Sequence, residues 1–178
     1  HEYIFAFEES YGYLCGDYAR DKDAVTASML IAEMAAYYRT QGKTLYDAME
    51  EMYEKYGYYC EQTISITMPG VSGLQRMKEL MEELRQTPLQ QVGPDKVEFI
   101  RDYQPGTRTS LADGKTEPME LQGQNVLYYE LSGGTIFIIR PSGTEPKVKV
   151  YIMAKGASNA DAADKVAALV SAAKEIVK

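Results

Sequence analysis

The sequence contains few of the residue types that build metal centres, disulfide frameworks or histidine-based catalytic sites. Tryptophan is absent, histidine occurs once, at His1, and there are two cysteines, Cys15 and Cys60. Two cysteines are too few for a disulfide framework or for a cysteine-based zinc site. A single histidine also argues against a histidine metal site and against a catalytic triad.

Long apolar runs and a basic charge balance are missing as well. No stretch of about 18 apolar residues occurs, so we expect no membrane-spanning helix and no membrane partner. No basic-then-apolar leader opens the chain, so we expect no signal peptide. The formal net charge of −7, from 19 Lys and Arg against 26 Asp and Glu, argues against a nucleic-acid partner, because cations on phosphates supply most of that affinity. A reducing, cytoplasmic setting fits best.

The remaining composition is typical of a folded globular protein. The 178 residues are 45% apolar and 25% charged, and this length corresponds to one domain or to one and a fraction. The first residue is not methionine, and residues 3–7 already read as a buried aromatic and apolar strand. We therefore expect a piece of a larger protein.

Residues 1–57 form the first of two predicted parts. After the strand at 3–7 comes a polar loop, then a helix that Asp23 can cap, then a second helix over residues 44–56. One strand and two helices are too few to bury a good core alone. We therefore interpret this part as a fragment of a domain.

Residues 58–178 form the second predicted part, in which strands dominate. The strand patterns cover residues 58–68, 96–103, 125–131, 135–140 and 147–155. The last of these alternates most cleanly, with Val148, Val150, Ile152 and Ala154 facing one side.

Two helices are expected in this second part. Ser72 and Gln75 have the spacing of a capping box at the start of a helix whose apolar stripe runs from Leu74 to Leu84. Ser158 can cap the last helix. Its predicted buried side consists of Ala163, Val166, Ala167, Val170 and Val177. The second part is therefore predicted to be α+β: a mainly antiparallel sheet with helices on one face.

The segment between the last two predicted strands has the composition of an oxyanion cradle. Residues 140–147 read Arg-Pro-Ser-Gly-Thr-Glu-Pro-Lys. An arginine offers a planar fork to two phosphate oxygens, hydroxyls donate hydrogen bonds, and a glycine lets a backbone amide approach an anion. The candidate phosphate-binding residues are Arg140, Ser142, Gly143, Thr144 and Lys149. An ordinary turn between strands uses the same residue types, so the pattern alone leaves both interpretations open.

Two charged segments near the N-terminus have the chemistry of a polar binding site. Residues 7–12 read Phe-Glu-Glu-Ser-Tyr-Gly, and residues 20–23 read Arg-Asp-Lys-Asp. Carboxylates beside a serine suit the hydroxyls of a sugar. Glu8 and Glu9 would point to opposite sides of an extended chain, so they do not form a glycosidase pair. Lys22 could transfer protons if its pKa were tuned. A polar loop and a solvated ladder of charges are the simpler interpretations.

Taken in order, these three segments resemble the α-D-phosphohexomutase superfamily, and within it the bacterial phosphoglucomutases of the phosphoglucomutase/phosphomannomutase type. Members of this family have four domains around one cleft and move a phosphoryl group between O1 and O6 of a hexose. A phosphoserine in the first domain donates the group, and a magnesium ion on an aspartate-rich loop of the second assists. The resemblance therefore implies hexose phosphate and hexose bisphosphate as ligands, and Mg²⁺ as the cofactor of the full-length enzyme.

The resemblance also implies a role for each candidate residue. The implied fold class is α+β: a mainly antiparallel four-stranded sheet with helices on one face, preceded by a strand and two helices from the end of an α/β domain. Residues 1–57 would be the C-terminal part of domain 3, whose sugar-binding residues would be Glu8, Ser10 and Arg20. Lys22 would be the candidate general acid/base. Residues 58–178 would be domain 4, which holds the substrate's distal phosphate through the five candidates between positions 140 and 149.

Other motifs of the family do not occur in the sequence. There is no Thr-Ala-Ser-His type serine loop and no Asp-x-Asp-x-Asp metal loop. The chain thus resembles the C-terminal part of an isomerase that interconverts glucose 1-phosphate and glucose 6-phosphate. We expect this part alone to be inactive, to hold no metal ion, and to need the N-terminal domains as its partner. A phosphopentomutase or phosphomannomutase, and a non-catalytic sugar-phosphate-binding module, are the alternatives.

Overall fold

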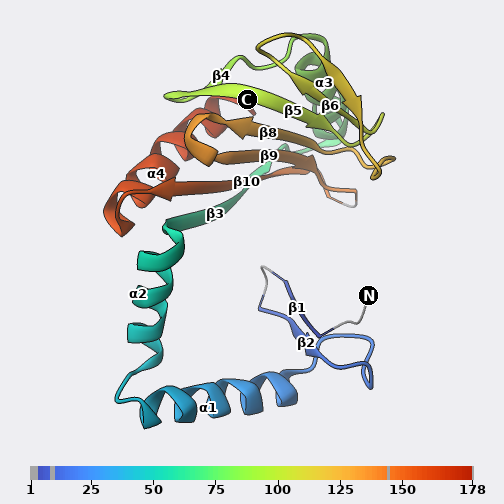
Figure 1. Cartoon of the computed structure of the whole chain (residues 1–178). Coiled ribbons are helices and arrows are strands. Elements are labelled where there is room, and N and C mark those ends of the chain that lie inside the picture. The colour runs from blue at the N-terminus through green and yellow to red at the C-terminus, as the bar shows by residue number, and fades with distance from the viewer. Residues whose placement is uncertain (1–3, 9–10, 144, 178) are drawn as a thin grey trace. The chain divides into compact units, whose positions relative to one another are not determined.

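The computed structural model describes residues 4–8, 11–143 and 145–177, except for the side chain of Val71. It consists of two units, His1–Tyr56 and Gly57–Lys178, each of which has its own architecture (Figure 1). Two predicted ligands, Ser10 and Thr144, lie outside the described residues. Among the described helices, none combines the length and the apolar character that a membrane crossing requires.

The first unit is a two-stranded hairpin followed by two helices. Strand β1 (Phe5–Phe7) pairs antiparallel with β2 (Tyr13–Cys15), where the sequence predicts a loop. Helices α1 (Ala24–Thr40) and α2 (Leu45–Tyr56) match the predicted segments. The N-cap of α1 is Asp23, as predicted, because its carboxylate accepts hydrogen bonds from the first free amides of the helix.

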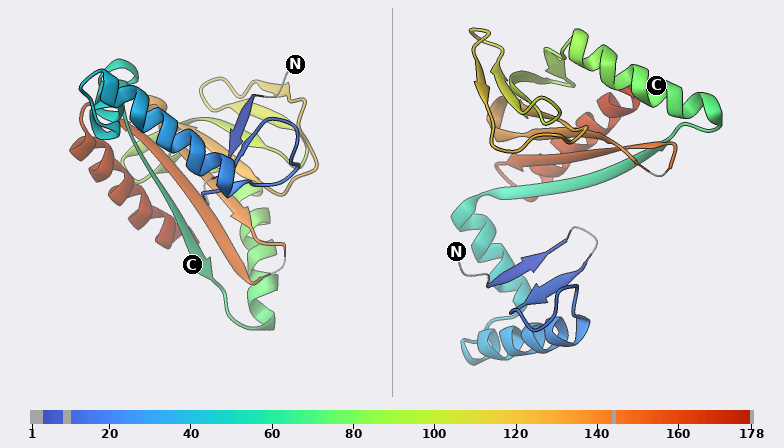
Figure 2. Two further views of the ribbon diagram at one scale, coloured as in Figure 1. Left: turned by 90° about the horizontal axis from the view of Figure 1, so that it is seen from below. Right: turned by 90° about the vertical axis from the view of Figure 1, so that its right-hand side faces the viewer.

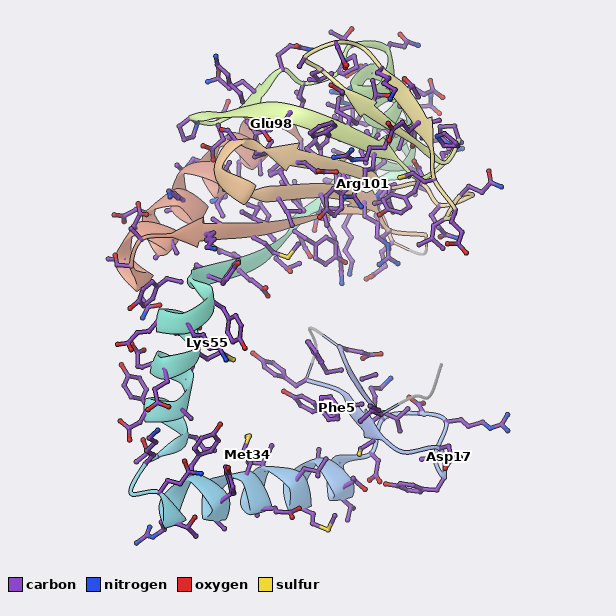
Figure 3. The ribbon with its side chains drawn as sticks, in the orientation of Figure 1. Phe5, Asp17, Met34, Lys55, Glu98 and Arg101 are labelled. Carbon is purple, nitrogen blue, oxygen red and sulfur yellow. The ribbon has the colours of Figure 1, made fainter. Side chains whose placement is uncertain are left out.

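The apolar side chains of this unit are only partly covered by other elements of the unit. The prediction of a buried strand is wrong for β1, since Phe5 and Phe7 are 47% and 72% exposed. Helices α1 and α2 contain no buried residue in the structure. An apolar groove of about 650 Å³ is bordered by the hairpin and by α1, which carry the labelled residues Phe5 and Met34 (Figure 3). A hairpin and two helices are too small to close a core of their own.

The second unit is an antiparallel sheet with its two long helices on one face. The strands follow the order β3-β10-β9-β8-β5-β6-β7, and β4 pairs with β5. Their bounds are β3 (Tyr58–Thr67), β4 (Gln91–Val92), β5 (Asp95–Asp102), β6 (Thr107–Ser110), β7 (Thr116–Pro118), β8 (Leu127–Leu131), β9 (Ile136–Pro141) and β10 (Lys147–Gly156). The α+β prediction is confirmed. The sheet is wider than the predicted four strands, because the stretch between β5 and β8 folds back as β6 and β7.

The core lies between the sheet and the helices α3 (Val71–Gln86) and α4 (Asn159–Ile176), which lie along the same side of the sheet (Figure 2). The predicted alternation of β10 is confirmed, since its four inward residues are no more than 1% exposed. The other fully buried large side chains include Tyr129, Phe137, Met81, Leu127, Leu131, Ile139 and Leu169. A short 3-10 turn, η1 (Ser132–Gly134), joins β8 to β9 at the predicted hairpin position.

Two predictions about the helices are wrong in detail. Helix α3 begins at Val71 with Gly70 as its N-cap and has no side-chain cap, so Ser72 and Gln75 do not form a capping box. Gln75 instead donates a hydrogen bond to Glu79 one turn later, and Leu74 is 49% exposed.

The buried face of α4 also differs from the predicted one. It consists of Ala162, Val166, Leu169 and Ala173. Val166 and Val177 are buried as predicted and Val170 packs against the core, whereas Ala163 and Ala167 are exposed. The predicted cap of this helix is confirmed, because Ser158 Oγ accepts a hydrogen bond from the Asp161 amide.

Candidate functional site

The cations beside the β9–β10 loop lie on the face of the sheet that the helices leave open. Arg140 in β9 is the partner of Lys149 in β10, which is in turn the partner of Ser65 in β3. Directly opposed residues of an antiparallel ladder have their side chains on one face. The alternating neighbours Ile139 and Val150 are fully buried, which places the three polar residues on the open face.

Main-chain hydrogen bonds hold both ends of this loop. The Ser142 amide donates to the Lys147 carbonyl at 2.9 Å, and the Met68 amide donates to the Pro146 carbonyl at 2.8 Å. The Glu145 amide donates to Ser142 Oγ at 3.3 Å. Glu145 also forms an ion pair with Lys147. The loop is therefore anchored to β10 and to the end of β3, and the charge of Lys147 is already neutralised.

Arg140 is the cation of the loop that remains available to a ligand. Its side chain is exposed, and within the described part of the chain no carboxylate forms an ion pair with it. Gly143 is also exposed, and a β-carbon added there would meet no atom within 4 Å. Packing within the unit therefore does not require a glycine at this position, and its role at a ligand stays a prediction.

In the first unit, the structure brings Glu8 and Lys22 together. The turn of the hairpin is closed by a 2.8 Å hydrogen bond from the Glu8 amide to the Gly12 carbonyl. The ammonium Nζ of Lys22 lies 3.0 Å from Asp21 Oδ1 and 3.5 Å from Glu8 Oε1. The hydrogen bond and charge of Asp21, followed by those of Glu8, raise the pKa of Lys22 above its ordinary value. Lys22 is therefore a protonated donor at neutral pH.

The other charges of the segment 20–23 have local roles. Asp23 caps α1, and its hydrogen bonds with Thr26 and Tyr18 lower its pKa to about 2. Its amide donates to the Tyr13 carbonyl at 2.8 Å, which ties the segment to β2. Arg20 is exposed, and among the described residues no hydrogen bond or ion pair joins it to Glu8 or Lys22. The structure thus brings Glu8, a predicted sugar ligand, to the candidate acid/base Lys22, and among the described residues it does not join Glu8 to Arg20.

A second charged cluster on the open face of the sheet was not predicted. Arg101 and Arg108 both bind Glu130, with Nε to Oε1 distances of 2.6 and 2.8 Å. Their guanidinium groups also lie over the rings of Tyr128 and Phe99, at 5.0 and 3.7 Å from the ring centres. Arg101 is labelled on this face in Figure 3. The hydrogen bonds from the arginines, Arg108 above all, lower the pKa of Glu130, so the cluster has one excess positive charge.

The described residues do not supply a metal site of the kind that the resemblance implies. Within residues 4–8, 11–143 and 145–177, no three histidine, cysteine, aspartate or glutamate side chains come close enough to hold an ion. A magnesium ion prefers carboxylate oxygens. We therefore assign no step to a metal through this part of the chain.

Comparison with known proteins relates both units to one family. Residues 1–56 match the family model described as phosphoglucomutase/phosphomannomutase, alpha/beta/alpha domain III, and residues 106–173 match the model of the C-terminal domain. A phosphoglucomutase of Staphylococcus aureus is 37% identical over 167 residues, which is 94% of this chain and 30% of the relative. A phosphoglucomutase of Staphylococcus haemolyticus is 37% identical over 150 residues, 84% of this chain and 27% of the relative.

A solved structure has the same fold. The exocytosis-sensitive phosphoprotein pp63/parafusin of Paramecium, a phosphoglucomutase in its open form, matches with a TM-score of 0.61 at 16% identity. The match covers 97% of this chain and 30% of that chain. The chain thus spans about a third of the length of the relatives that it matches. On the two domain models and the identities with these relatives, the chain belongs to the phosphoglucomutase/phosphomannomutase family.

Proposed function

We propose that this chain supplies two substrate-binding elements of a cytoplasmic phosphoglucomutase that interconverts glucose 1-phosphate and glucose 6-phosphate through a bisphosphate. The loop between β9 and β10 would hold the phosphate that is not reacting. The β1–β2 hairpin and the segment 20–23 would hold the sugar hydroxyls. The phosphoserine donor and the magnesium ion would belong to other domains of the enzyme, which act with this chain as its partners.

The observation that carries the proposal is the exposed guanidinium of Arg140 on the open face. No described carboxylate pairs with it, and Lys149 lies across the ladder from it. A planar guanidinium binds two phosphate oxygens at once, and such charge-assisted hydrogen bonds are about twice as strong as neutral ones. Ser142 adds a hydroxyl at the start of the loop, and Gly143 and Thr144 would contribute their amides or hydroxyl beside it.

The hairpin supports the second half of the proposal. Glu8 has a carboxylate that would accept hydrogen bonds from sugar hydroxyls, and Ser10 and Arg20 would form further hydrogen bonds with the sugar. Lys22 is held protonated by Asp21 and Glu8. It would therefore enter the reaction as a general acid, by giving a proton to a sugar or phosphate oxygen, and would act as a base in the reverse direction.

The phosphate site is tested by binding to the 178-residue protein. Glucose 6-phosphate and glucose 1,6-bisphosphate should shift the amide resonances of residues 140–149, and Arg140→Ala should weaken binding by about 10- to 100-fold. Arg76→Ala is the matched control, because Arg76 lies on α3 and pairs with Glu83. Equal affinities of the two variants would contradict the proposal.

Turnover assays separate the enzyme from the alternatives. The 178-residue protein alone should not convert glucose 1-phosphate, whereas the full-length enzyme should do so and should lose most of this activity with Arg140→Ala. Turnover by the 178 residues alone would contradict the proposal that other domains supply the phosphoserine and the magnesium ion. A full-length enzyme that prefers mannose or pentose phosphates would favour a phosphomannomutase or phosphopentomutase, and binding without turnover would favour a non-catalytic module.

A further inference from the structure

Gly12 occupies a position where the chain needs space rather than an unusual backbone conformation. It is buried at the end of the hairpin turn, directly before β2. Its φ is not positive, in contrast to Tyr11, with a φ of 64°, and Gly16, with a φ of 79°. The backbone at position 12 is therefore open to any L-amino acid.

The side chain of Lys22 fills the space that a larger residue would need. A β-carbon built on Gly12 would lie 2.6 Å from Lys22 Cγ, closer still to Lys22 Cδ, and 3.0 Å from Glu8 Oε2. The methylene stem of Lys22 thus crosses directly over Gly12. This path brings its ammonium to Glu8, which is 14 positions away in the sequence.

The main chain on both sides fixes this crossing. Glu8 and Gly12 are joined by the hydrogen bond that closes the turn, and the amide of Asp23 donates to the carbonyl of Tyr13. Lys22 is therefore held between two anchored segments. A methyl group at position 12 cannot be accommodated by a small shift of the backbone, so the lysine stem has to move.

We propose that Gly12 is a positioning residue, whose missing side chain lets Lys22 cross the hairpin and holds Lys22 and Glu8 together as one ion-paired unit. The inference rests on the proposed function in one respect: this unit would be what the hairpin presents to the sugar. A residue larger than glycine at position 12 separates the ammonium from Glu8 and leaves it beside Asp21, its neighbour in the sequence.

The charged groups around Lys22 make the separation measurable. Among the described residues, Asp21 and Glu8 face its ammonium, and both favour the protonated form. Loss of the contact with Glu8 therefore lowers the pKa of Lys22 toward its ordinary value, while Asp21 keeps part of the effect. A lysine with a lower pKa has more free amine at a given pH and reacts faster with acylating reagents.

The test is competitive acylation of the protein with acetic anhydride between about pH 8 and pH 11, with mass spectrometry of each lysine. Gly12→Ala should raise the rate at Lys22 by about twofold or more relative to Lys78 in the second unit. Gly16→Ala is the matched control. It strains the same hairpin through its positive φ, and the nearest atoms belong to Tyr18 and not to Lys22. An unchanged Lys22 profile in Gly12→Ala, or an equal change in Gly16→Ala, would overturn the proposal.

A second pair of variants separates displacement of Lys22 from unfolding of the hairpin. In a Lys22→Ala background the obstructing stem is gone, so Gly12→Ala should leave hydrogen exchange of the Asp23 amide unchanged. Faster exchange in that double variant would show that the hairpin backbone itself requires glycine at position 12, whatever the path of Lys22, and would overturn the proposal. These measurements need no sugar. If glucose 6-phosphate fails to protect Lys22 from acylation, the proposed function loses support while the role of Gly12 stands.

Discussion

Tyr129→Phe is a test of the core in which removal of a polar group should not weaken the protein. The ring of Tyr129 is 0% exposed and lies 6.2 Å from the ring of Phe137. Its hydroxyl has no hydrogen-bond partner among the described residues. A buried hydroxyl without a partner costs about 1–3 kcal/mol. The variant keeps the ring and loses the oxygen, so the free energy of unfolding should stay the same or rise by up to about 2 kcal/mol.

The same substitution should change how stability depends on pH. Burial raises the pKa of Tyr129 far above the ordinary value of 10.0. In the unfolded chain this phenol ionises near pH 10, whereas in the folded unit it keeps its proton. Its contribution to stability is therefore complete below pH 10 and is lost as the pH rises toward the folded-state value, by at most about 1.4 kcal/mol per pH unit. The variant lacks this loss.

The measurement is urea unfolding followed by far-ultraviolet circular dichroism at pH 7 and near pH 11. The difference in unfolding free energy should favour Tyr129→Phe more strongly at the higher pH. Tyr59→Phe is the control, because Tyr59 belongs to the same unit and is 45% exposed. A loss of more than about 1 kcal/mol at pH 7 would refute the reasoning, since it would mean that the hydroxyl makes a favourable hydrogen bond. Equal alkaline losses in parent and variant would refute the pH argument.

The remaining predictions concern single contacts. Gly73→Ala should lower the unfolding free energy of the second unit by about 2 kcal/mol or more, because its β-carbon would lie 2.6 Å from the carbonyl carbon of Met68. Gly143→Ala should not change that free energy, and should weaken only phosphate binding. Glu130→Gln should cost about 1 kcal/mol at pH 7. The pKa of Glu130 is lowered below 4.5, so its contribution exists above pH 4.5 and is lost on acidification; urea titrations of the parent and the variant should therefore converge at low pH. Asp23→Ala should speed hydrogen exchange of the first amides of α1 and leave the second unit unaffected.

Parts of the fold with strong local patterns were predictable from the sequence. In β10 every second residue is a large or small aliphatic group, and only one face can be apolar when the period is two. In the first unit, Asp23 stands directly before an apolar run, where an acceptor satisfies free helix amides. Both features depend on neighbours in the chain and on nothing else.

Other features depend on packing that the sequence does not encode locally. Helix α4 is rich in alanine, so several faces have similar hydrophobicity and the choice of Ala162 and Leu169 over Ala163 and Ala167 follows from contact with the sheet. Helix α3 begins before Ser72, at Val71, and Gly73 in its first turn lies close to the carbonyl of Met68. Ser72 and Gln75 have the spacing of a capping box, but Ser72 lies inside the helix and not at its N-cap, so the two residues cannot form one.

In the candidate site, too, features made of consecutive residues could be predicted, whereas contacts between residues far apart in the sequence could not. The segment 140–147 could be identified because all its residues are consecutive. The contact between Glu8 and Lys22 spans 14 positions, and the cluster of Arg101 with Glu130 spans 29. Such contacts follow from strand order and from the path of a loop, which no periodicity reveals.

The acidic net charge of the chain does not conflict with a phosphate site on the second unit. Residues 1–56 have 5 Lys and Arg against 11 Asp and Glu, whereas residues 57–178 have 14 against 15. Most of the charge imbalance therefore belongs to the first unit. Exposed charges more than about 8 Å apart are largely screened at physiological ionic strength, so a phosphate beside the β9–β10 loop responds to the nearest groups. Those groups are Arg140 and Lys149 on one face, with Lys147 already paired with Glu145. The two cations on one face of the sheet thus make the proposed phosphate site compatible with the acidic net charge of the protein.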